Sequence, residues 1–295
     1  MHEIEEKESV WNRPISRRSF LKKTAIFGAI GGLGIEGFAL EPRQVAVTNT
    51  DIYIAGLPDD FDGFRICQLT DVHHGPLINI KFVEKVIEQA NQLKPDAFVL
   101  TGDYVSSAPK YIRPVINAFG KLNAPYGTYA VLGNHDHWEG EEICIKNFKR
   151  NKIPLLTNTN AVITKRGSIC IAGVGDYLED TQEPDKAFKG IPDDMPRILL
   201  SHHPDYSEEI PKDIRVDLVI SGHTHGGQVQ IPMLGIAPII PSKYGQKYVN
   251  GLVKNSKTQV YVSRGVGMIG IPVRFSCPPE IAILTLKKKD ISLQI

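Results

Sequence analysis

The chain has 295 residues, of which 42% are hydrophobic and 23% charged, a balance typical of a globular protein with a substantial core. Because 34 basic residues stand against 33 acidic ones, the formal net charge is only +1, which argues against nucleic acid as a partner. The four cysteines are widely spaced and form no CxxC motif, so they predict small buried side chains rather than a thiolate metal site, with a disulfide left open.

Residues 1–43 have the pattern of a twin-arginine export signal. Arg17 and Arg18 stand in the stretch SRRSFLKK, and a glycine-rich, moderately apolar stretch follows at residues 24–40. That stretch contains Glu36 and is shorter than the roughly 20 residues that a membrane helix needs. It is therefore either removed after export or kept as a membrane anchor. The signal predicts the twin-arginine machinery as a partner and a location at the outer face of the cytoplasmic membrane, in the periplasm or in the cell wall.

From residue 44 onward, short apolar runs alternate with amphipathic ones. Strands are expected at 44–54 and 64–71, and a helix at 79–94, where apolar residues recur at helical spacing behind Asn79 as the N-cap. The later elements continue this rhythm, with strands at 97–103, 127–136, 168–176, 197–205, 216–225, 259–265 and 280–286 and helices at 113–122 and 141–150. The pattern predicts an α/β fold with largely parallel central strands in a single domain.

The candidate functional residues follow these strands. Five apolar runs end in Asp, Asn or His, and the set is Asp71, His73, Asp103, Asn134, His135, Asp136, His202, His223 and His225. Because the carboxyl ends of strands border the ligand crevice in open α/β sheets, these side chains are expected to converge. Oxygen and imidazole donors without thiolates suit two divalent cations of manganese, iron or zinc. In the Asp-x-His and His-x-His pairs, an extended backbone would point both side chains to one face.

Five motifs in this order, DVH, GD, GNHD, SHHP and GHTH, resemble those of the calcineurin-like metallophosphoesterases. Three longer stretches, GLPDDFDGFRICQLTDVH, GHTHGGQ and RFSCPPEIAIL, further resemble the exported, twin-arginine-type bacterial branch of that family. The resemblance covers about residues 44–290. It implies a four-layer αββα sandwich, in which two mixed β-sheets lie face to face with helices outside, for the domain at 44–295.

The resemblance also implies a role for each candidate. The implied metal ligands form two sets and a bridge: Asp71, His73 and His225 for one ion, Asn134, His202 and His223 for the other, and Asp103 between them. His135 would face the substrate as a general acid, Asp136 would orient it, and Gly133 would allow close backbone approach. Three more histidines are expected outside the ligand sets: His203 beside substrate or solvent, and His74 and His137 at the rim.

The implied activity is metal-dependent phosphoester hydrolysis, with a phosphodiester as the favoured substrate and a hydroxide activated by two metals as the nucleophile. Envelope exposure favours a lipid-linked or cell-wall-linked phosphate. One alternative is a UDP-2,3-diacylglucosamine pyrophosphohydrolase of lipid A synthesis, with an acyl groove lined by residues 233–245 and 264–275, which otherwise are ordinary packed loops. Arg264 and Arg274 would contact phosphate or form structural salt bridges. The second alternative is a non-catalytic metal-binding envelope protein, which loss of a ligand or of His135 would favour.

Overall fold

The computed structural model describes residue 37 and residues 40–289. The predicted export signal at residues 1–43 lies almost entirely outside these described residues, so it stays a prediction. Within the described part of the chain, no helix is long and apolar enough to cross a membrane.

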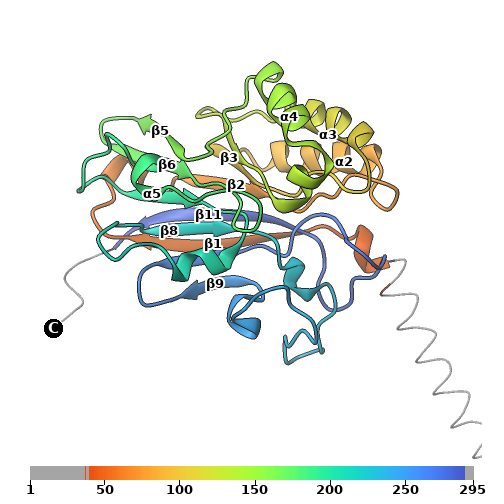
Figure 1. Ribbon diagram of the computed structural model, residues 1–295. Coiled ribbons are helices and arrows are strands. Elements are labelled where there is room, and N and C mark those ends of the chain that lie inside the picture. Colours follow the sequence, from red (N-terminus) through yellow and green to blue (C-terminus); the bar gives the residue numbers. More distant parts are fainter. Residues whose placement is uncertain (1–36, 38–39, 290–295) are drawn as a thin grey trace, which may run out of the picture.

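Two mixed β-sheets form the centre of the molecule (Figure 1). The first sheet has the strand order β1 (Ala46–Ile54), β11 (Glu280–Lys288), β2 (Arg65–Leu69), β3 (Ala97–Thr101) and β4 (Thr128–Val131). Its strands are parallel except for the antiparallel pair of β11 with β2. The second sheet has the order β5 (Thr159–Thr164), β6 (Ser168–Gly173), β7 (Arg197–Leu200), β8 (Leu218–Ser221), β10 (Gln259–Val262) and β9 (Gly251–Lys254). In this sheet the two edge strands are antiparallel to their neighbours: β5 to β6, and β9 to β10.

Helices cover the outer face of each sheet. On the first sheet these are α2 (Ile80–Gln92), α3 (Ile112–Phe119) and α4 (Asn134–Arg150), and on the second α5 (Pro184–Ala187) and the 3-10 turn η6 (Pro204–Glu208). The helix α2 begins as predicted, since the Asn79 side chain accepts a hydrogen bond from the Phe82 backbone N–H.

The apolar side chains fill three layers. A middle layer joins the two sheets, with Ile66 and Val99 from one facing Ile198 and Leu218 from the other. Two outer layers lie between each sheet and its helices. The predicted α/β class and the four-layer αββα sandwich are therefore confirmed.

Several elements differ from the sequence expectation, among them the short helix α5, which was not predicted, and β4, which ends before the GNHD motif. The edge strands β5 and β9 were not expected, since edge strands are short and half exposed and leave a weak hydrophobic pattern. The helix α4 begins at Asn134, directly within the GNHD motif, and not at 141. The four cysteines are buried and free, as small buried hydrophobes.

Candidate metal centre

The predicted ligands meet at one edge of the sandwich, where the carboxyl ends of β2, β3 and β4 from one sheet approach those of β7 and β8 from the other. The candidate ligands form three groups, and within each group the ligand atoms lie within 4.8 Å of one another. The groups are Asp71, His73 and His225; His73, Asp103 and His135; and Asp103, His202 and His223. The convergence expected from the strand-end pattern is thus present in the structure, and Asp103 belongs to two of the three groups.

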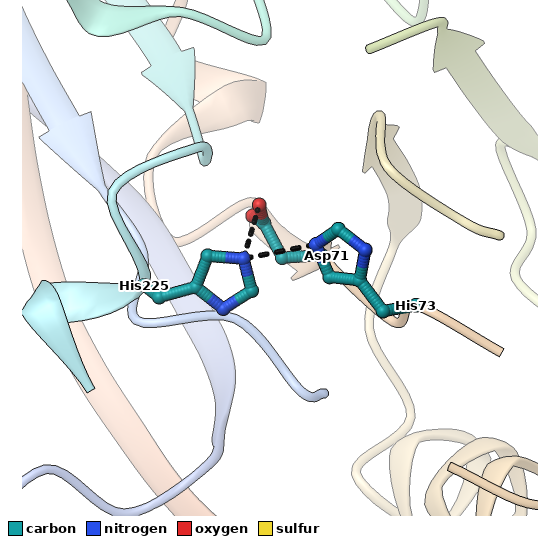
Figure 2. A group of neighbouring side chains, drawn as sticks. All are labelled: Asp71, His73 and His225. Carbon is teal, nitrogen blue, oxygen red and sulfur yellow. Dashed lines mark hydrogen bonds and ion pairs between the residues drawn. The ribbon is translucent and has the colours of Figure 1, made fainter. Parts of the chain in front are cut away.

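Asp71, His73 and His225 form the first group, and Figure 2 shows that the first two, from the turn after β2, converge with His225 from the turn after β8. The two imidazole Nε2 atoms are 2.9 Å apart, and His225 Nε2 lies 3.3 Å from Asp71 Oδ1. Thr70 Oγ1 donates to Asp71 Oδ2 at 2.8 Å, and the His223 backbone N–H donates to the same carboxylate. These outer bonds fix the carboxylate while leaving the three donor atoms directed at one point.

Asp103 lies between this group and the next one. Its Oδ2 is 3.5 Å from His73 Nε2 and 3.3 Å from His202 Nε2. Its Oδ1 accepts a hydrogen bond from the His135 backbone N–H at 2.9 Å. One oxygen of Asp103 therefore faces an imidazole of each group, which is the arrangement that a bridging carboxylate requires.

His202, His223 and Asn134 surround the second position. The carbonyl of Thr101 lies 2.7 Å from His202 Nδ1, so this nitrogen carries a proton and Nε2 faces the site. The His223 ring is in turn held by the Pro241 carbonyl. Asn134 Oδ1 and His202 Nε2 are buried and have no hydrogen-bond partner among the described residues.

The segments that carry these ligands are not extended, so the expectation that i, i+2 alternation aligns them is wrong. Asp71, His73, Asp103, His223 and His225 all have positive φ angles, between 47° and 68°. Each backbone therefore turns sharply directly after its strand, and the turn aims the side chain. Left-handed conformations are uncommon for residues other than glycine and concentrate at functional sites, where surrounding contacts maintain them.

Glycines let these turns pack against each other. A Cβ on Gly133 would lie 2.4 Å from Asp103 Oδ1, and one on Gly222 would lie 2.1 Å from Asp71 Oδ2. The close approach predicted for Gly133 is thus present, because any larger residue would displace a candidate ligand.

His135 stands at the boundary between the ligands and the open cavity. Its ring makes an edge contact with the His73 ring, at 4.8 Å between centroids, and another with Trp138 at 4.6 Å. The residue is half-buried and lines the cavity. Its backbone is fixed by Asp103, whereas its ring faces the space where a substrate would lie.

Asp136 does not orient His135, contrary to the expectation. Its carboxylate accepts hydrogen bonds from the backbone N–H groups of Asp103 at 2.8 Å, Tyr104 at 2.9 Å and Gly133 at 3.0 Å. No hydrogen bond within the described part of the chain joins it to the His135 ring. As the third residue of α4, Asp136 caps its own helix and ties it to the turn after β3. Its role is therefore to hold the backbone that positions Asp103.

We expect Asp136→Ala to lower the free energy of unfolding by about 3–5 kcal/mol, because three buried backbone N–H groups lose their shared acceptor. Urea denaturation measures this change. Glu141→Ala on the same helix is the matched control, because the Glu141 side chain is 48% exposed and its pairing with the His137 ring should cost under about 1 kcal/mol to lose. Equal stability of the two variants would contradict the assignment.

Burial determines the protonation of the first group. It raises the pKa of Asp71 to about 7 and lowers the pKa of His73 to about 3, and it holds the pKa of His225 well below its ordinary value. Burial by itself would raise the pKa of Asp103 and lower the pKa of His202. The attraction between these two side chains outweighs burial, so the pKa of Asp103 falls and the pKa of His202 rises. Asp136, which is buried and repelled by Asp103, has its pKa raised to about 8.

This donor set fits divalent cations. The imidazoles of His73 and His225, which burial keeps neutral, are in the form that such ions bind, and carboxylate oxygens supply the other ligands. The unpartnered Asn134 Oδ1 and His202 Nε2 supply donors that nothing else in the described structure satisfies, and leaving a buried polar atom unsatisfied costs roughly 1–3 kcal/mol. Oxygen and nitrogen donors without sulfur match manganese, iron or zinc.

The other candidates of the sequence lie outside these groups. His74 is buried, with Nδ1 2.8 Å from the Ile78 carbonyl, so it is a core residue and not a rim residue as expected. Arg274 is fully buried and donates to the carbonyls of Arg264, Gly265, Gly267 and Cys277, which leaves it no access to a phosphate. Arg264 pairs with Glu280 at 3.6 Å. Both arginines are therefore structural.

The ligand groups form the floor of a cavity of about 700 Å³. Its walls include Trp138, Tyr177 and Asp205, which the sequence analysis did not name, and Lys243, which lies in the stretch 233–245 considered for an acyl groove. Asp205 accepts hydrogen bonds from the Ser242 hydroxyl at 2.5 Å and the Lys243 backbone N–H at 2.7 Å, and so fixes this wall. The position of Asp205 at the end of the predicted strand 197–205 was the signal that could have identified it. His203 is buried but also lines the cavity, and the centroid of its ring lies 3.9 Å from that of the tilted His223 ring.

Comparisons with known proteins bear on this site. The family model of calcineurin-like phosphoesterases matches residues 64–227, which include all the ligand motifs. The uncharacterized metallophosphoesterase YkuE of Bacillus subtilis is 35% identical, over 94% of this chain and 100% of its own length. Phosphodiesterase YaeI of Escherichia coli is 31% identical, over 92% of this chain and 99% of its own length. An uncharacterized metallophosphoesterase of Helicobacter pylori is 32% identical, over 98% of this chain and 76% of its own length.

Among solved structures, the NAD nucleotidase NadN of Haemophilus influenzae superimposes with a TM-score of 0.49 at 16% identity, over 69% of this chain and 50% of that chain. The family match spans more than half of the chain, and YkuE and YaeI are similar to this chain over more than nine-tenths of its length. With the ligand groups assembled at the strand ends, these similarities lead to one conclusion. The chain belongs to the calcineurin-like metallophosphoesterases, hydrolases that act on phosphoric esters.

Proposed function

We propose that this protein hydrolyses phosphodiesters with two divalent cations held by the converging groups. The observation that carries the proposal is Asp103, one oxygen of which faces His73 on one side and His202 on the other. A single carboxylate at that position is what two-metal hydrolysis needs, since the ions in such sites are about 3.5–4 Å apart.

The residues that would hold the cations are Asp71, His73 and His225 for one, Asn134, His202 and His223 for the other, and Asp103 for both. When bound, two divalent cations neutralise the charge of the phosphoryl oxygens and make water acidic enough to attack at neutral pH. Thr70, Thr101 and Pro241 keep the donor atoms oriented through their own hydrogen bonds.

His135 would act on the leaving group. Its ring faces the cavity beside both ligand groups, within reach of the oxygen that departs from a phosphoryl group placed over Asp103. An imidazolium there protonates that oxygen, which a strongly basic alkoxide leaving group requires. The side chain of His135 lies against Trp138, with the two ring centroids 4.6 Å apart.

Two observations favour a diester over a monoester. YaeI, which is similar over nearly its whole length, is named a phosphodiesterase. The cavity of about 700 Å³ also extends well beyond the ligand groups, with Leu178, Ile239 and Ile269 among its lining, so it has room for a second substituent on the phosphate.

We further propose that the protein works at the cell envelope. The twin-arginine pattern at residues 16–23 and the apolar stretch at 24–40 support this, as does the likeness of the longer motifs to the exported bacterial branch. The substrate would then be a lipid-linked or cell-wall-linked phosphate. Fusing residues 1–43 to a reporter that is active only outside the cytoplasm tests the export signal, with the pair Arg17→Lys and Arg18→Lys as the variant that should abolish transport.

A direct assay tests the activity. The purified protein, loaded with Mn²⁺ or Zn²⁺, should cleave bis(p-nitrophenyl) phosphate faster than p-nitrophenyl phosphate. A faster monoester reaction would reject the diester assignment, and no reaction with either substrate under any of the metals would reject the proposal altogether.

Chelation should destabilise the folded protein, because the cations bind the native site and not the unfolded chain. Free metal at about 1,000 times the dissociation constant adds about 4 kcal/mol to the free energy of unfolding, which amounts to a shift in Tm of about 10 °C for a domain of this size. Differential scanning calorimetry with and without EDTA measures it. His225→Ala should reduce the shift, whereas His74→Ala, a buried histidine outside the ligand groups, should leave it unchanged.

A further inference from the structure

Two loops beside the cavity carry large apolar side chains that protrude into solvent. We call this surface the apolar rim, and define it as Ile231, Met233, Leu234, Ile236, Ile239 and Ile271. Met233 is fully exposed, Ile239 is 79% exposed and Leu234 is 65% exposed. Single exposed hydrophobic residues are common, but a contiguous group beside an active site marks a surface that binds protein, ligand or membrane.

The two loops form one surface. The Gln228 side chain both donates to the Ile269 carbonyl and accepts from the Ile269 N–H, each at 2.8 Å. The backbone of Gln230 bonds to that of Phe275, and Ile231 pairs with Ile236 across the tip of its loop. These bonds hold the rim residues of both loops together.

The rim is continuous with the cavity. Ile239 belongs to the rim and lines the cavity, where Ile269 from the other loop also lies. Trp138 and Leu178, each more than half exposed, lie among the lining of the same cavity. An apolar substituent of a molecule held at the ligand groups would therefore pass from the cavity directly onto the rim.

The apolar stretch at residues 24–40 joins the folded domain next to this surface. The Gly37 carbonyl accepts a hydrogen bond from the Arg274 N–H at 3.0 Å, and the Glu41 carboxylate accepts from the backbone N–H groups of Ser276 and Cys277. The loop that carries Ile271 is thus tied to the end of that stretch. If the stretch stays as a membrane anchor, as the envelope proposal allows, it holds the rim against the bilayer.

The charge of the region agrees with a lipid partner. No Asp or Glu occurs between Asp217 and Glu280, so both rim loops lack carboxylates that would be repelled by anionic headgroups. Lys243, whose side chain is 66% exposed, lies at the cavity wall and supplies a positive charge beside the rim.

We propose that the apolar rim inserts into the surface of a lipid bilayer and that the cavity takes its phosphoester from a lipid at that surface. The inference rests on the proposed function and narrows its substrate to an amphiphilic phosphodiester. Six exposed apolar side chains gain free energy by leaving water at the acyl boundary, and the candidate catalytic groups then face the headgroups directly.

Fluorescence of the full chain tests the docking without any reaction. The chain has two tryptophans, so the background Trp11→Phe/Trp138→Phe removes their signal. In this background, Leu234→Trp reports on the rim, and Tyr53→Trp is the matched control. Tyr53 is 53% exposed, but it lies at the end of β1 far from Glu41, beside a separate groove. Both proteins retain the N-terminal stretch, so its own affinity for lipid affects them equally.

Vesicles of phosphatidylethanolamine and phosphatidylglycerol with brominated acyl chains should quench the Leu234→Trp signal and leave the Tyr53→Trp signal unchanged. Equal quenching of both, or of neither, would overturn the proposal. A concentration-dependent dimer in lipid-free sedimentation that Met233→Ser/Leu234→Ser/Ile271→Ser abolishes would also overturn it, since the rim would then bind a second copy of the chain.

Turnover separates this inference from the proposed function. In Met233→Ser/Leu234→Ser/Ile271→Ser, none of the changed residues lines the cavity, so hydrolysis of bis(p-nitrophenyl) phosphate should be unchanged. Hydrolysis of a phosphodiester lipid in phosphatidylglycerol vesicles should fall by at least about tenfold, because three inserting side chains are lost. The control triple is Tyr53→Ser/Val162→Ser/Leu252→Ser, which should behave as wild type. If the wild type cleaves neither substrate, the proposed function fails while the fluorescence result still decides the docking; equal lipid hydrolysis by both triples contradicts the docking.

Discussion

Asp103→Asn should reduce metal-dependent hydrolysis of bis(p-nitrophenyl) phosphate by at least about a thousandfold, because a neutral amide replaces the one carboxylate shared by two ligand groups. The replaced oxygen faces His73 Nε2 at 3.5 Å and His202 Nε2 at 3.3 Å. Because the amide keeps an oxygen that can accept from the His135 N–H, the fold should be retained.

Three measurements make this test decisive: the rate, the metal content of the purified protein and the circular dichroism spectrum. A folded variant with little metal and no turnover is the expected outcome. A variant with the activity of wild type would refute the bridging role of Asp103, whatever its metal content.

His135→Ala should retain its metal but lose turnover, with kcat lowered by about 10²–10⁴-fold, because the ring faces the cavity and would donate the proton to the leaving oxygen. The loss should depend on the leaving group. A nitrophenolate leaves readily without a proton, so bis(p-nitrophenyl) phosphate should be affected less than a diester with an alkyl leaving group.

This dependence distinguishes a proton donor from a metal ligand, which matters because the ring atoms of His135 also lie within ligand distance of His73 and Asp103. Loss of metal from His135→Ala, or an equal loss of rate for both kinds of leaving group, would contradict the assignment as general acid. His137→Ala, two residues further along α4 with its ring paired to Glu141, provides the control and should keep both metal and rate.

The role of Asp136 shows what a motif leaves open. GNHD places a carboxylate beside a histidine in the sequence, and that adjacency suggested that Asp136 supports His135. In the folded chain the two residues lie on the first turn of α4 and point in different directions. Asp136 reaches back to the turn after β3, where the N–H groups of Asp103 and Tyr104 lack other acceptors. Only the approach of β3 to the start of α4 makes that contact available.

The loops beside the cavity are a second case in which the sequence did not reveal where side chains point. From the sequence, residues 233–245 and 264–275 were expected to be ordinary packed loops, with an acyl groove as the alternative, because apolar composition does not reveal the direction of a side chain. The structure buries Arg274 and exposes Met233, Leu234 and Ile271. The outcome depends on backbone pairing between the loops, such as Gln230 with Phe275, and that pairing leaves no sequence signal.

The sequence by itself determined the donor types, their order and their place at the ends of strands. It could do so because apolar runs identify strands locally, and parallel strands bring their carboxyl ends to the same edge of a sheet. Tertiary structure alone decided which donors share a position, how the left-handed turns at Asp71 and His225 aim them, and that Asp103 lies between two groups. Those features depend on distances of a few ångströms between segments that are far apart in the chain, and such distances are fixed only when both sheets pack together.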